Sequence, residues 1–310
     1  MAVPAFTLAT LKKGTKADLA AAFAALETRP QSAEVIGLLD EAWENPYGHV
    51  IGLTGPPGVG KSSLVNALVK RWRAKGHTIG IIAVDPTSQL SGGALLGDRI
   101  RIDAAPDEGV FIRSMAARDQ IGGLAALTAA TCIVMRAIYD RVIVETVGIG
   151  QSQTDIVNLA DTVVVCVQPG SGDSLQFMKA GIMEVPHVAV VSKADLGISA
   201  SRALADVEGA LSLSVAGDGW GVRCLALSAV TGAGLEAFDE TITAHFAFLK
   251  GEGALGRQRK KQGEALLVAA LKEAYGREGL KRAQPLIEIF REGSPFARAV
   301  QIGEKLSAAP

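Results

Sequence analysis

The chain has 310 residues, of which 48% are hydrophobic, so it has enough apolar side chains for a substantial core. Its formal net charge is −1, from 31 basic and 32 acidic side chains, and no basic face dominates; this argues against a general nucleic-acid binder or a membrane-surface binder. No run of about eighteen apolar residues occurs and no signal-peptide core is evident, so we expect a cytoplasmic protein without a membrane span.

Residues 1–46 are expected to form a helical N-terminal extension. Apolar residues recur at three- and four-residue spacing over 16–27 and 32–43, and Pro30 separates the two runs. The sequence Asn-Pro-Tyr-Gly at 45–48 then ends the helical pattern, and we place a domain boundary there.

A phosphate-binding loop follows the first apolar run. Residues 55–62 read Gly-Pro-Pro-Gly-Val-Gly-Lys-Ser, a complete G-x-x-x-x-G-K-[ST] motif between an expected strand and an expected helix. Glycines allow the backbone to turn so that successive N–H groups converge on phosphate oxygens at the positive end of the helix. We expect Lys61 to reach the β- and γ-phosphates and the Ser62 hydroxyl to coordinate Mg²⁺. The predicted nucleotide-binding residues of this loop are Gly55, Pro56, Pro57, Gly58, Val59, Gly60, Lys61, Ser62 and Ser63.

Short β-branched runs alternate with amphipathic helical patterns over residues 47–250. The expected strands cover 49–54, 78–84, 110–112, 141–145, 162–167, 187–191 and 224–227. This alternation predicts βαβ units, and with the phosphate loop it predicts an α/β fold of the P-loop NTPase class, with a mainly parallel sheet flanked by helices. Ligands of such sheets bind outside the carboxyl ends of the strands, so the segments that follow strands are the candidate site segments.

Three acidic residues follow or end these strands. Asp85 lies at the end of a strand, where a carboxylate could take the metal or a metal-bound water, and Asp98 lies across a small-residue loop that could respond to a γ-phosphate. Considered alone, both would equally well cap turns. Glu145 ends its strand where a P-loop NTPase places a second metal-associated acid. The predicted metal ligands are Ser62, Asp85, Asp98 and Glu145.

A glycine hinge follows Glu145. The N–H of Gly148 is expected to meet the γ-phosphate, and Gln151 is placed to orient an attacking water, although a polar turn residue fits the pattern equally well. The predicted catalytic residues are Lys61, Asp85, Glu145 and Gln151.

After the strand expected over 187–191 the sequence reads Ser-Lys-Ala-Asp, close to the N-K-x-D segment with which GTPases read guanine. The Asp195 carboxylate would accept from guanine N1–H and N2–H₂ and would repel the N1 acceptor of adenine. Ser192 stands where Asn is expected, and its shorter side chain is expected to give up a contact with guanine N7 or with the phosphate loop. The predicted base readers are Ser192, Lys193, Asp195, Ser228 and Ala229.

Residues 251–310 are again expected to be helical. The pattern runs over 257–275 and 279–291, with a break predicted at Pro285. The basic run 257–261 is interpreted as a solvated helical face.

Three widely spaced cysteines provide neither a disulfide framework nor a Cys-x-x-Cys metal site. We interpret Cys132, Cys166 and Cys224 as small core residues in a reducing compartment.

With these residues in view, the chain resembles the methylmalonyl-CoA mutase-associated GTPases of the MeaB/ArgK/MMAA type. The segments that carry the resemblance are 55–63, 83–102, 144–156 and 168–185. The resemblance implies a homodimeric GTPase that uses GTP/GDP and Mg²⁺ and serves as chaperone for an adenosylcobalamin-dependent acyl-CoA mutase. Such a chaperone gates delivery of the cobalamin cofactor and protects or reactivates the mutase.

The resemblance also implies roles for particular segments. Residues 47–250 would be the GTPase domain, 168–179 a further switch that senses the mutase, and 251–310 a dimerisation arm. A cobalamin adenosyltransferase is a further candidate partner. By the same resemblance, Asp85, Asp98 and Glu145 match the acids around the metal, and Lys193 and Asp195 match the base readers.

Besides a non-catalytic binding module that keeps the fold without hydrolysis, which the Ser192 replacement leaves open, two alternative functions stay open at this point. The first is a nickel-delivery GTPase of the hydrogenase or urease type, which would need a metal-binding Cys/His segment; the chain has four scattered histidines and no paired cysteines. The second is an ATP-dependent kinase acting on a small molecule, which would have no need of Asp195.

Overall fold

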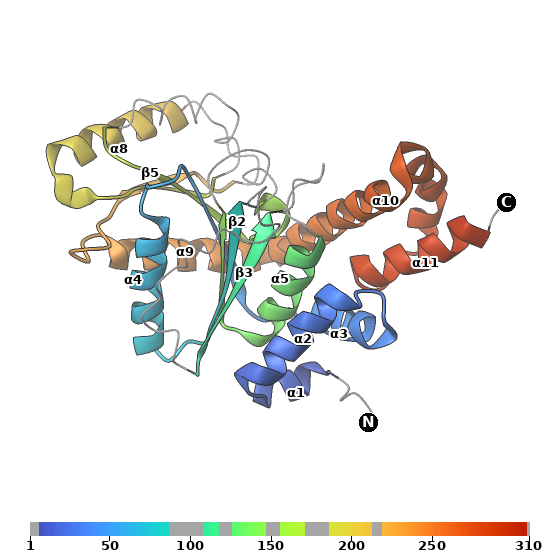
Figure 1. Ribbon diagram of the computed structural model, residues 1–310. Coiled ribbons are helices and arrows are strands. Elements are labelled where there is room, and N and C mark those ends of the chain that lie inside the picture. Colours follow the sequence, from blue (N-terminus) through green and yellow to red (C-terminus); the bar gives the residue numbers. More distant parts are fainter. Residues whose placement is uncertain are drawn as a thin grey trace.

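The structure is a computed structural model that describes residues 6–86, 108–117, 126–146, 156–170, 186–212 and 219–308. Its centre is one parallel sheet of seven strands in the order β3-β2-β4-β1-β5-β6-β7 (Figure 1). The strands are β1 His49–Thr54, β2 Ile79–Pro86, β3 Val110–Ala117, β4 Arg141–Thr146, β5 Thr162–Val167, β6 Val188–Val191 and β7 Arg223–Ala226. The predicted α/β fold with a parallel sheet is confirmed, and β3 runs five residues further than the expected 110–112.

The central strands are apolar on both faces, which is why they read as continuous hydrophobic runs rather than as alternating patterns. Every residue of β1 and β5 is buried. Successive side chains point to opposite faces, so Val50 and Val163 join one core layer and Ile51 and Val164 the other.

Helices cover both faces of the sheet (Figure 1). Helices α4 Lys61–Ala74 and α9 Leu235–Lys250 pack on one face. Helix α5 Ala126–Ile138 packs on the other, and α8 Ile198–Leu211 covers β6 and β7 on that same side of the strands. The phosphate loop therefore lies between the first central strand and the helix beside it.

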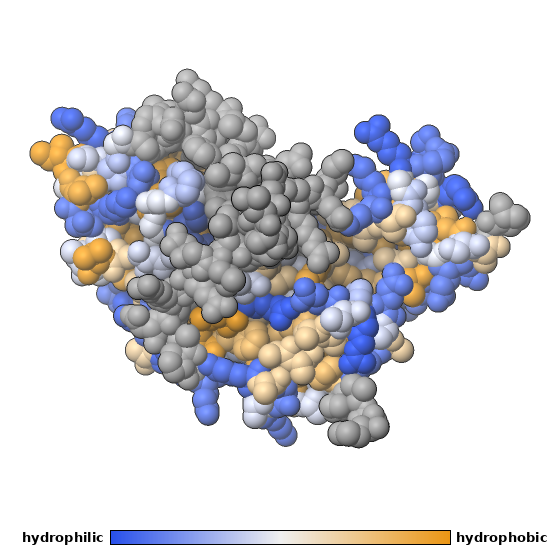
Figure 2. Space-filling view, viewed as in Figure 1, coloured by the Kyte–Doolittle hydropathy of each residue, from blue (hydrophilic) through white to orange (hydrophobic). Residues whose placement is uncertain are grey.

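The N-terminal helices belong to the core layer that includes α5. They are α1 Leu8–Lys13, α2 Lys16–Thr28 and α3 Ala33–Glu44, with Thr15 and Ser32 as N-caps whose hydroxyls accept backbone N–H groups at 3.3 Å. Phe23 of α2 lies against Phe111 of β3, with ring centroids 5.3 Å apart. The outward face of α2 carries exposed alanines, and Figure 2 shows pale-orange surface in this region of the molecule.

The C-terminal helices are α10 Ala254–Ile289 and α11 Pro295–Ala308, which folds back on α10 through a small cluster that includes Leu271 and Ile302 (Figure 1). The break predicted at Pro285 is wrong: α10 continues through this residue, and the non-helical residue is Gly276, with φ 68° and ψ −170°. Glycine takes this positive φ without a Cβ clash, whereas proline has a φ that a helix accepts and costs one hydrogen bond. No helix in the described part of the chain is both long and apolar enough to cross a membrane.

The basic run 257–261 is only partly a solvated face. Lys260 and Lys261 are exposed as expected, but Arg259 is 6% exposed, so the interpretation is wrong for this residue. Its guanidinium binds both oxygens of Asp161 at 2.8 and 2.7 Å and the carbonyl oxygen of Gly48 at 2.7 Å. Arg259 faces inward because α10 runs beside the short helix Ile156–Asn158 and the start of β5, and there the carboxylate provides its partner.

The cysteines are unpaired thiols. Cys132 and Cys166 are buried, and burial raises the pKa of each thiol to about 12. Cys224 is partly buried, so the core interpretation holds fully for the first two.

Candidate functional site

The phosphate loop connects β1 to α4 at the carboxyl edge of the sheet. Gly55, Gly58 and Gly60 all have positive φ, at 141°, 73° and 100°. A Cβ on Gly55 would lie 2.3 Å from the carbonyl oxygen of Cys166 in β5, so this position has no room for a side chain. Gly60 is the N-cap of α4 in the left-handed conformation. The loop therefore has the backbone geometry of a phosphate cradle at a helix N-terminus.

Lys61 begins α4 and is folded over this loop. The residue is 7% exposed, and its ammonium group donates to the carbonyl oxygens of Gly55 at 2.7 Å and Pro56 at 3.1 Å. Burial lowers the pKa of Lys61, while the nearby Glu145 carboxylate and the Cys166 thiol act in the opposite direction. A phosphate oxygen could replace these carbonyl acceptors and would bring a full negative charge to the buried cation.

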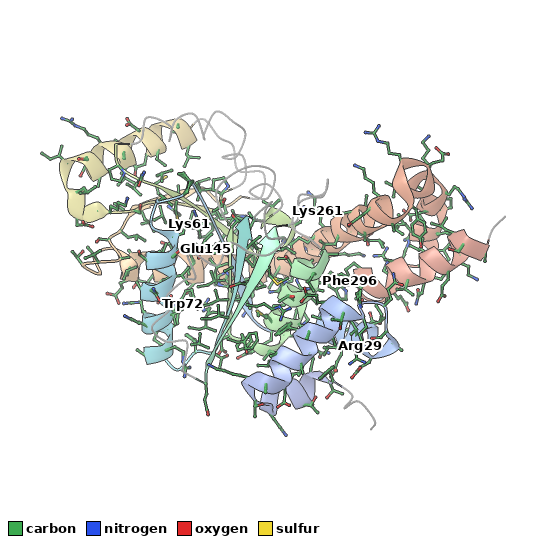
Figure 3. The ribbon with its side chains drawn as sticks, viewed as in Figure 1. Arg29, Lys61, Trp72, Glu145, Lys261 and Phe296 are labelled. Atoms are coloured by element: carbon green, nitrogen blue, oxygen red, sulfur yellow. The ribbon has the colours of Figure 1, made fainter. Side chains whose placement is uncertain are left out.

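Ser62 and Glu145 form a pair of oxygen ligands beside the loop. The Ser62 hydroxyl donates to Glu145 Oε1 at 2.9 Å, and Lys61 and Glu145 lie close together in Figure 3. Glu145 lies in β4, in register with Leu53 of β1 and Ala83 of β2, so the sheet itself places this carboxylate next to the loop. A hydroxyl and a carboxylate are hard oxygen donors, and a Mg²⁺ site that takes its remaining ligands from phosphate and water fits this pair.

The other predicted acids and hinge residues are less completely described. The backbone of Asp85 lies in β2, one residue before the strand ends and in register with Ala116 of β3. Asp98, Gly148 and Gln151 lie outside the described residues, as does most of 168–179. Their roles stay predictions.

The Ser192–Asp195 segment follows β6 and contacts the phosphate loop directly. Ser192 Oγ donates to the carbonyl oxygen of Val59 at 2.6 Å, with that of Val167 3.0 Å away. Lys193 Nζ donates to the carbonyl oxygen of Gly58 at 3.1 Å, and among the described residues Lys193 is the one non-glycine with positive φ, at 57°. Of the two contacts that the shorter serine was expected to weaken, the one with the phosphate loop is therefore present.

Asp195 and the Ser228–Ala229 turn lie beside this segment. Asp195 is exposed, so a nucleotide base could reach its carboxylate. The Ala194 N–H donates to the carbonyl oxygen of Leu227 at 3.0 Å, which holds the two segments together. Ser228 is buried and stabilises its own turn, because its N–H donates to the Ala233 carbonyl oxygen at 2.9 Å and its hydroxyl accepts from the Thr231 N–H at 3.2 Å.

Sequence reasoning missed two residues that support this site. Gln168 Oε1 accepts from Lys193 Nζ at 2.7 Å, and its position directly after β5 was the available signal. Asp239 of α9 accepts from Trp72 Nε1 at 2.8 Å, Arg71 Nε at 3.2 Å and Lys75 Nζ, and so anchors the far end of α4. Burial raises the pKa of Asp239, but these hydrogen bonds and the Lys75 charge outweigh it and hold the pKa below its ordinary value. No sequence motif marks Asp239.

The described residues contain no group of three or more His, Cys, Asp or Glu side chains that could hold a metal ion by themselves. A metal bound at the Ser62–Glu145 pair would therefore need ligands from elsewhere, which is how Mg²⁺ is held in nucleotide sites.

Comparison with known proteins places this site in a family. The family model described as methylmalonyl Co-A mutase-associated GTPase MeaB matches residues 19–279. The chain is 37% identical to a putative GTPase of Pyrococcus horikoshii, with 96% of each protein aligned. It is 35% identical to GTPase ArgK of Escherichia coli, over 81% of this chain and 78% of that protein. A crystal structure described as an LAO/AO transport system kinase matches with a TM-score of 0.69 and 26% identity, over 97% of this chain and 96% of that one. The resemblance inferred from the sequence is confirmed, and the chain belongs to the MeaB family of P-loop GTPases.

Proposed function

We propose that this GTPase is a chaperone for an adenosylcobalamin-dependent acyl-CoA mutase, which gates delivery of the cobalamin cofactor and protects or reactivates the mutase. The observation that carries the proposal is the match, over most of the chain, to a family described by its association with methylmalonyl-CoA mutase. A cobalamin adenosyltransferase is a further proposed partner in the same delivery step.

The proposed reaction is in-line attack of water on the γ-phosphate of GTP. The loop N–H groups and Lys61 bind the β- and γ-phosphates, and Gln151 orients the water. Ser62 and Glu145, with Asp85 and Asp98, would hold Mg²⁺. When bound, this ion neutralises charge that develops on the phosphate oxygens.

Base selection is proposed for the segments after β6 and β7. The Asp195 carboxylate accepts from guanine N1–H and N2–H₂, and the Lys193 stem packs on the ring. The N–H at Ala229 donates to guanine O6. The exposure of Asp195 and its closeness to the Ser228–Ala229 turn support these roles.

Loss of the γ-phosphate would then change how the GTPase binds the mutase. We propose that segments 86–118 and 148–158 change their contacts on hydrolysis, with the Gly148 N–H as one γ-phosphate contact. That difference in contacts changes the affinity for the mutase.

Phosphate release from GTP tests the proposal, measured with and without a purified adenosylcobalamin-dependent mutase. We expect slow intrinsic turnover that the mutase accelerates, and we expect Lys61→Ala to abolish turnover while the chain keeps its circular dichroism spectrum. Turnover retained by Lys61→Ala would refute the site. A mutase that neither binds nor accelerates turnover would refute the partner and leave the GTPase assignment standing.

A further inference from the structure

Ser192 has already used its hydrogen-bond donors within the protein. A hydroxyl has one proton to donate, and the two nearest partners of Ser192 Oγ are both carbonyl oxygens, at 2.6 Å in Val59 and 3.0 Å in Val167. The Ser192 N–H donates to the same Val167 oxygen at 2.9 Å. The side chain is 6% exposed, so water does not compete for these bonds. Neither the N–H nor the O–H of Ser192 is left to donate to a ligand.

The acceptor in the shorter of these bonds belongs to the phosphate loop. Val59 and Gly58 are consecutive loop residues, and Ser192 and Lys193 are consecutive residues after β6, so the two segments are joined by two adjacent bonds. The bond to the Val59 carbonyl oxygen fixes the peptide group that carries the Gly60 N–H, at the N-cap of α4, and the bond to Gly58 fixes the peptide group whose Val59 N–H donates to the Pro56 carbonyl oxygen at 3.4 Å. The Ser192 hydroxyl therefore acts on the phosphate end of the nucleotide, although the residue belongs to the base-reading segment.

Among the polar groups of guanine, N7 and O6 accept, and N1–H and N2–H₂ donate. A contact to N7 needs a donor, and the Asp195 carboxylate is an acceptor. We propose that Ser192 is a positioning residue for the phosphate loop and that this GTPase reads guanine through its N1, N2 and O6 groups without a contact to N7. The inference rests on the proposed nucleotide site and defines its base recognition.

The probe is 7-deaza-GTP, which carries C–H in place of N7 and is otherwise GTP. We expect the wild-type chain with Mg²⁺ to bind the two nucleotides with Kd values within about twofold of each other, because no bond is lost. Ser192→Ala should raise the Kd values for GTP and 7-deaza-GTP by the same factor, about three- to tenfold. The reason is that the substitution removes one hydrogen bond to the phosphate loop, whichever base is bound. Ser201→Ala, which removes an exposed hydroxyl of α8, is the matched control and should change neither Kd.

Ser192→Asn completes the set, because an amide has a second N–H to donate beyond the one that replaces the hydroxyl bond. Where this variant binds, it should prefer GTP over 7-deaza-GTP by about three- to tenfold.

A wild-type Kd for 7-deaza-GTP at least about tenfold above that for GTP overturns the inference, and more firmly if Ser192→Ala removes the difference. Equal wild-type values with no common loss in Ser192→Ala overturn the positioning role. Failure of the wild-type chain to bind either nucleotide refutes the proposed nucleotide site itself, which distinguishes that result from the other two.

Discussion

A buried ion pair joins α10 to the residue that precedes β5. Arg259 and Asp161 are both almost fully buried, and Asp161 Oδ2 also accepts from the Val50 N–H at 2.8 Å. Removing one partner leaves a buried charge uncompensated, so we expect Arg259→Met to lower the free energy of unfolding by about 3–5 kcal/mol. Urea denaturation measures this. Lys260→Met, on the exposed neighbour, is the control and should change it by about 0.5 kcal/mol or less. Equal effects of the two substitutions would contradict the assigned role.

A relay of buried polar side chains lies at the opposite end of the strands from the phosphate loop. Arg141 Nη1 donates to His49 Nδ1 at 2.7 Å, which leaves His49 Nε2–H to donate to Thr162 Oγ1 at 2.7 Å. The Thr162 hydroxyl then donates to His245 Nδ1 at 2.8 Å. Both histidines are therefore neutral in the folded chain.

This relay makes stability depend on pH. Burial, and secondly the charge of His187, lowers the pKa of His245 from 6.5 to about 3. His245 binds a proton near pH 6.5 in the unfolded chain but only near pH 3 in the folded chain. The free energy of unfolding therefore keeps its full value above pH 6.5 and decreases as the pH falls below it. We expect protonation of His245 to lower the free energy of unfolding by about 1.4 kcal/mol per pH unit within that window.

Urea denaturation at several pH values checks this expectation. His245→Asn keeps an acceptor near Nδ1 without the titrating ring, so its stability should fall less steeply between pH 6.5 and 4 than that of the wild type. Parallel curves for the two proteins would refute the contribution of His245.

At the residue scale, the sequence predicted what a local motif fixes. The phosphate-loop motif sets the backbone around Lys61 and Ser62, and Glu145 lies one residue before the end of β4, so the sequence could predict where these side chains lie; their roles as phosphate and metal ligands stay predictions. The position of Arg259 could not be predicted, since its burial depends on Asp161, almost a hundred residues away along the chain. The roles of Asp98, Gly148 and Gln151 stay predictions.

At the scale of elements, one glycine sets how closely α10 approaches α3. A Cβ on Gly263 would lie 2.4 Å from the Trp43 ring, whereas a Cβ on Gly256 of the same helix would meet nothing within 4 Å. We expect Gly263→Ala to destabilise the chain by about 1–3 kcal/mol through overpacking. Gly256→Ala, the control, should stabilise it by about 0.5–1 kcal/mol through helix propensity. The unfolding temperatures of the two variants test this expectation. A Gly263→Ala chain that is more stable than the wild type would contradict the close packing of Gly263 on Trp43.

The elements themselves were largely predictable. Continuous apolar runs identified the central strands because buried parallel strands are apolar on both faces, whereas β7 at the sheet edge is only partly buried. The gap left between the expected runs 257–275 and 279–291 contains the non-helical Gly276, whereas the break expected at Pro285 is wrong because proline is a strong helix-breaking signal that this helix tolerates. The domain boundaries after residues 46 and 250 stay predictions.

At the scale of the whole molecule, α10 and α11 project from the sheet domain (Figure 1), and two of the large apolar side chains on α10 are exposed. Ile289 is 69% exposed and Tyr275 39% exposed. We expect these helices to form the proposed dimer, with a sedimenting mass twice the chain's 32.1 kDa. Ile289→Lys should shift the chain toward the monomer, and Ile198→Lys, on exposed α8, should leave it unchanged. A monomeric wild-type protein would contradict the proposed arm.

Family membership also separates the alternatives left open by the sequence. A GTPase of the MeaB family accounts for the phosphate loop, the exposed Asp195 and the Ser62–Glu145 pair together. Neither nickel delivery nor small-molecule phosphorylation is favoured by any of these features.

The affinity of the mutase for the two nucleotide states tests the central claim most directly. Isothermal titration of the purified mutase into the chain would be run once with a non-hydrolysable GTP analogue and Mg²⁺, and once with GDP. The account predicts Kd values that differ by about tenfold or more, which is about 1.4 kcal/mol of coupling. Equal Kd values would contradict it, because a partner with equal affinity for both states cannot respond to hydrolysis.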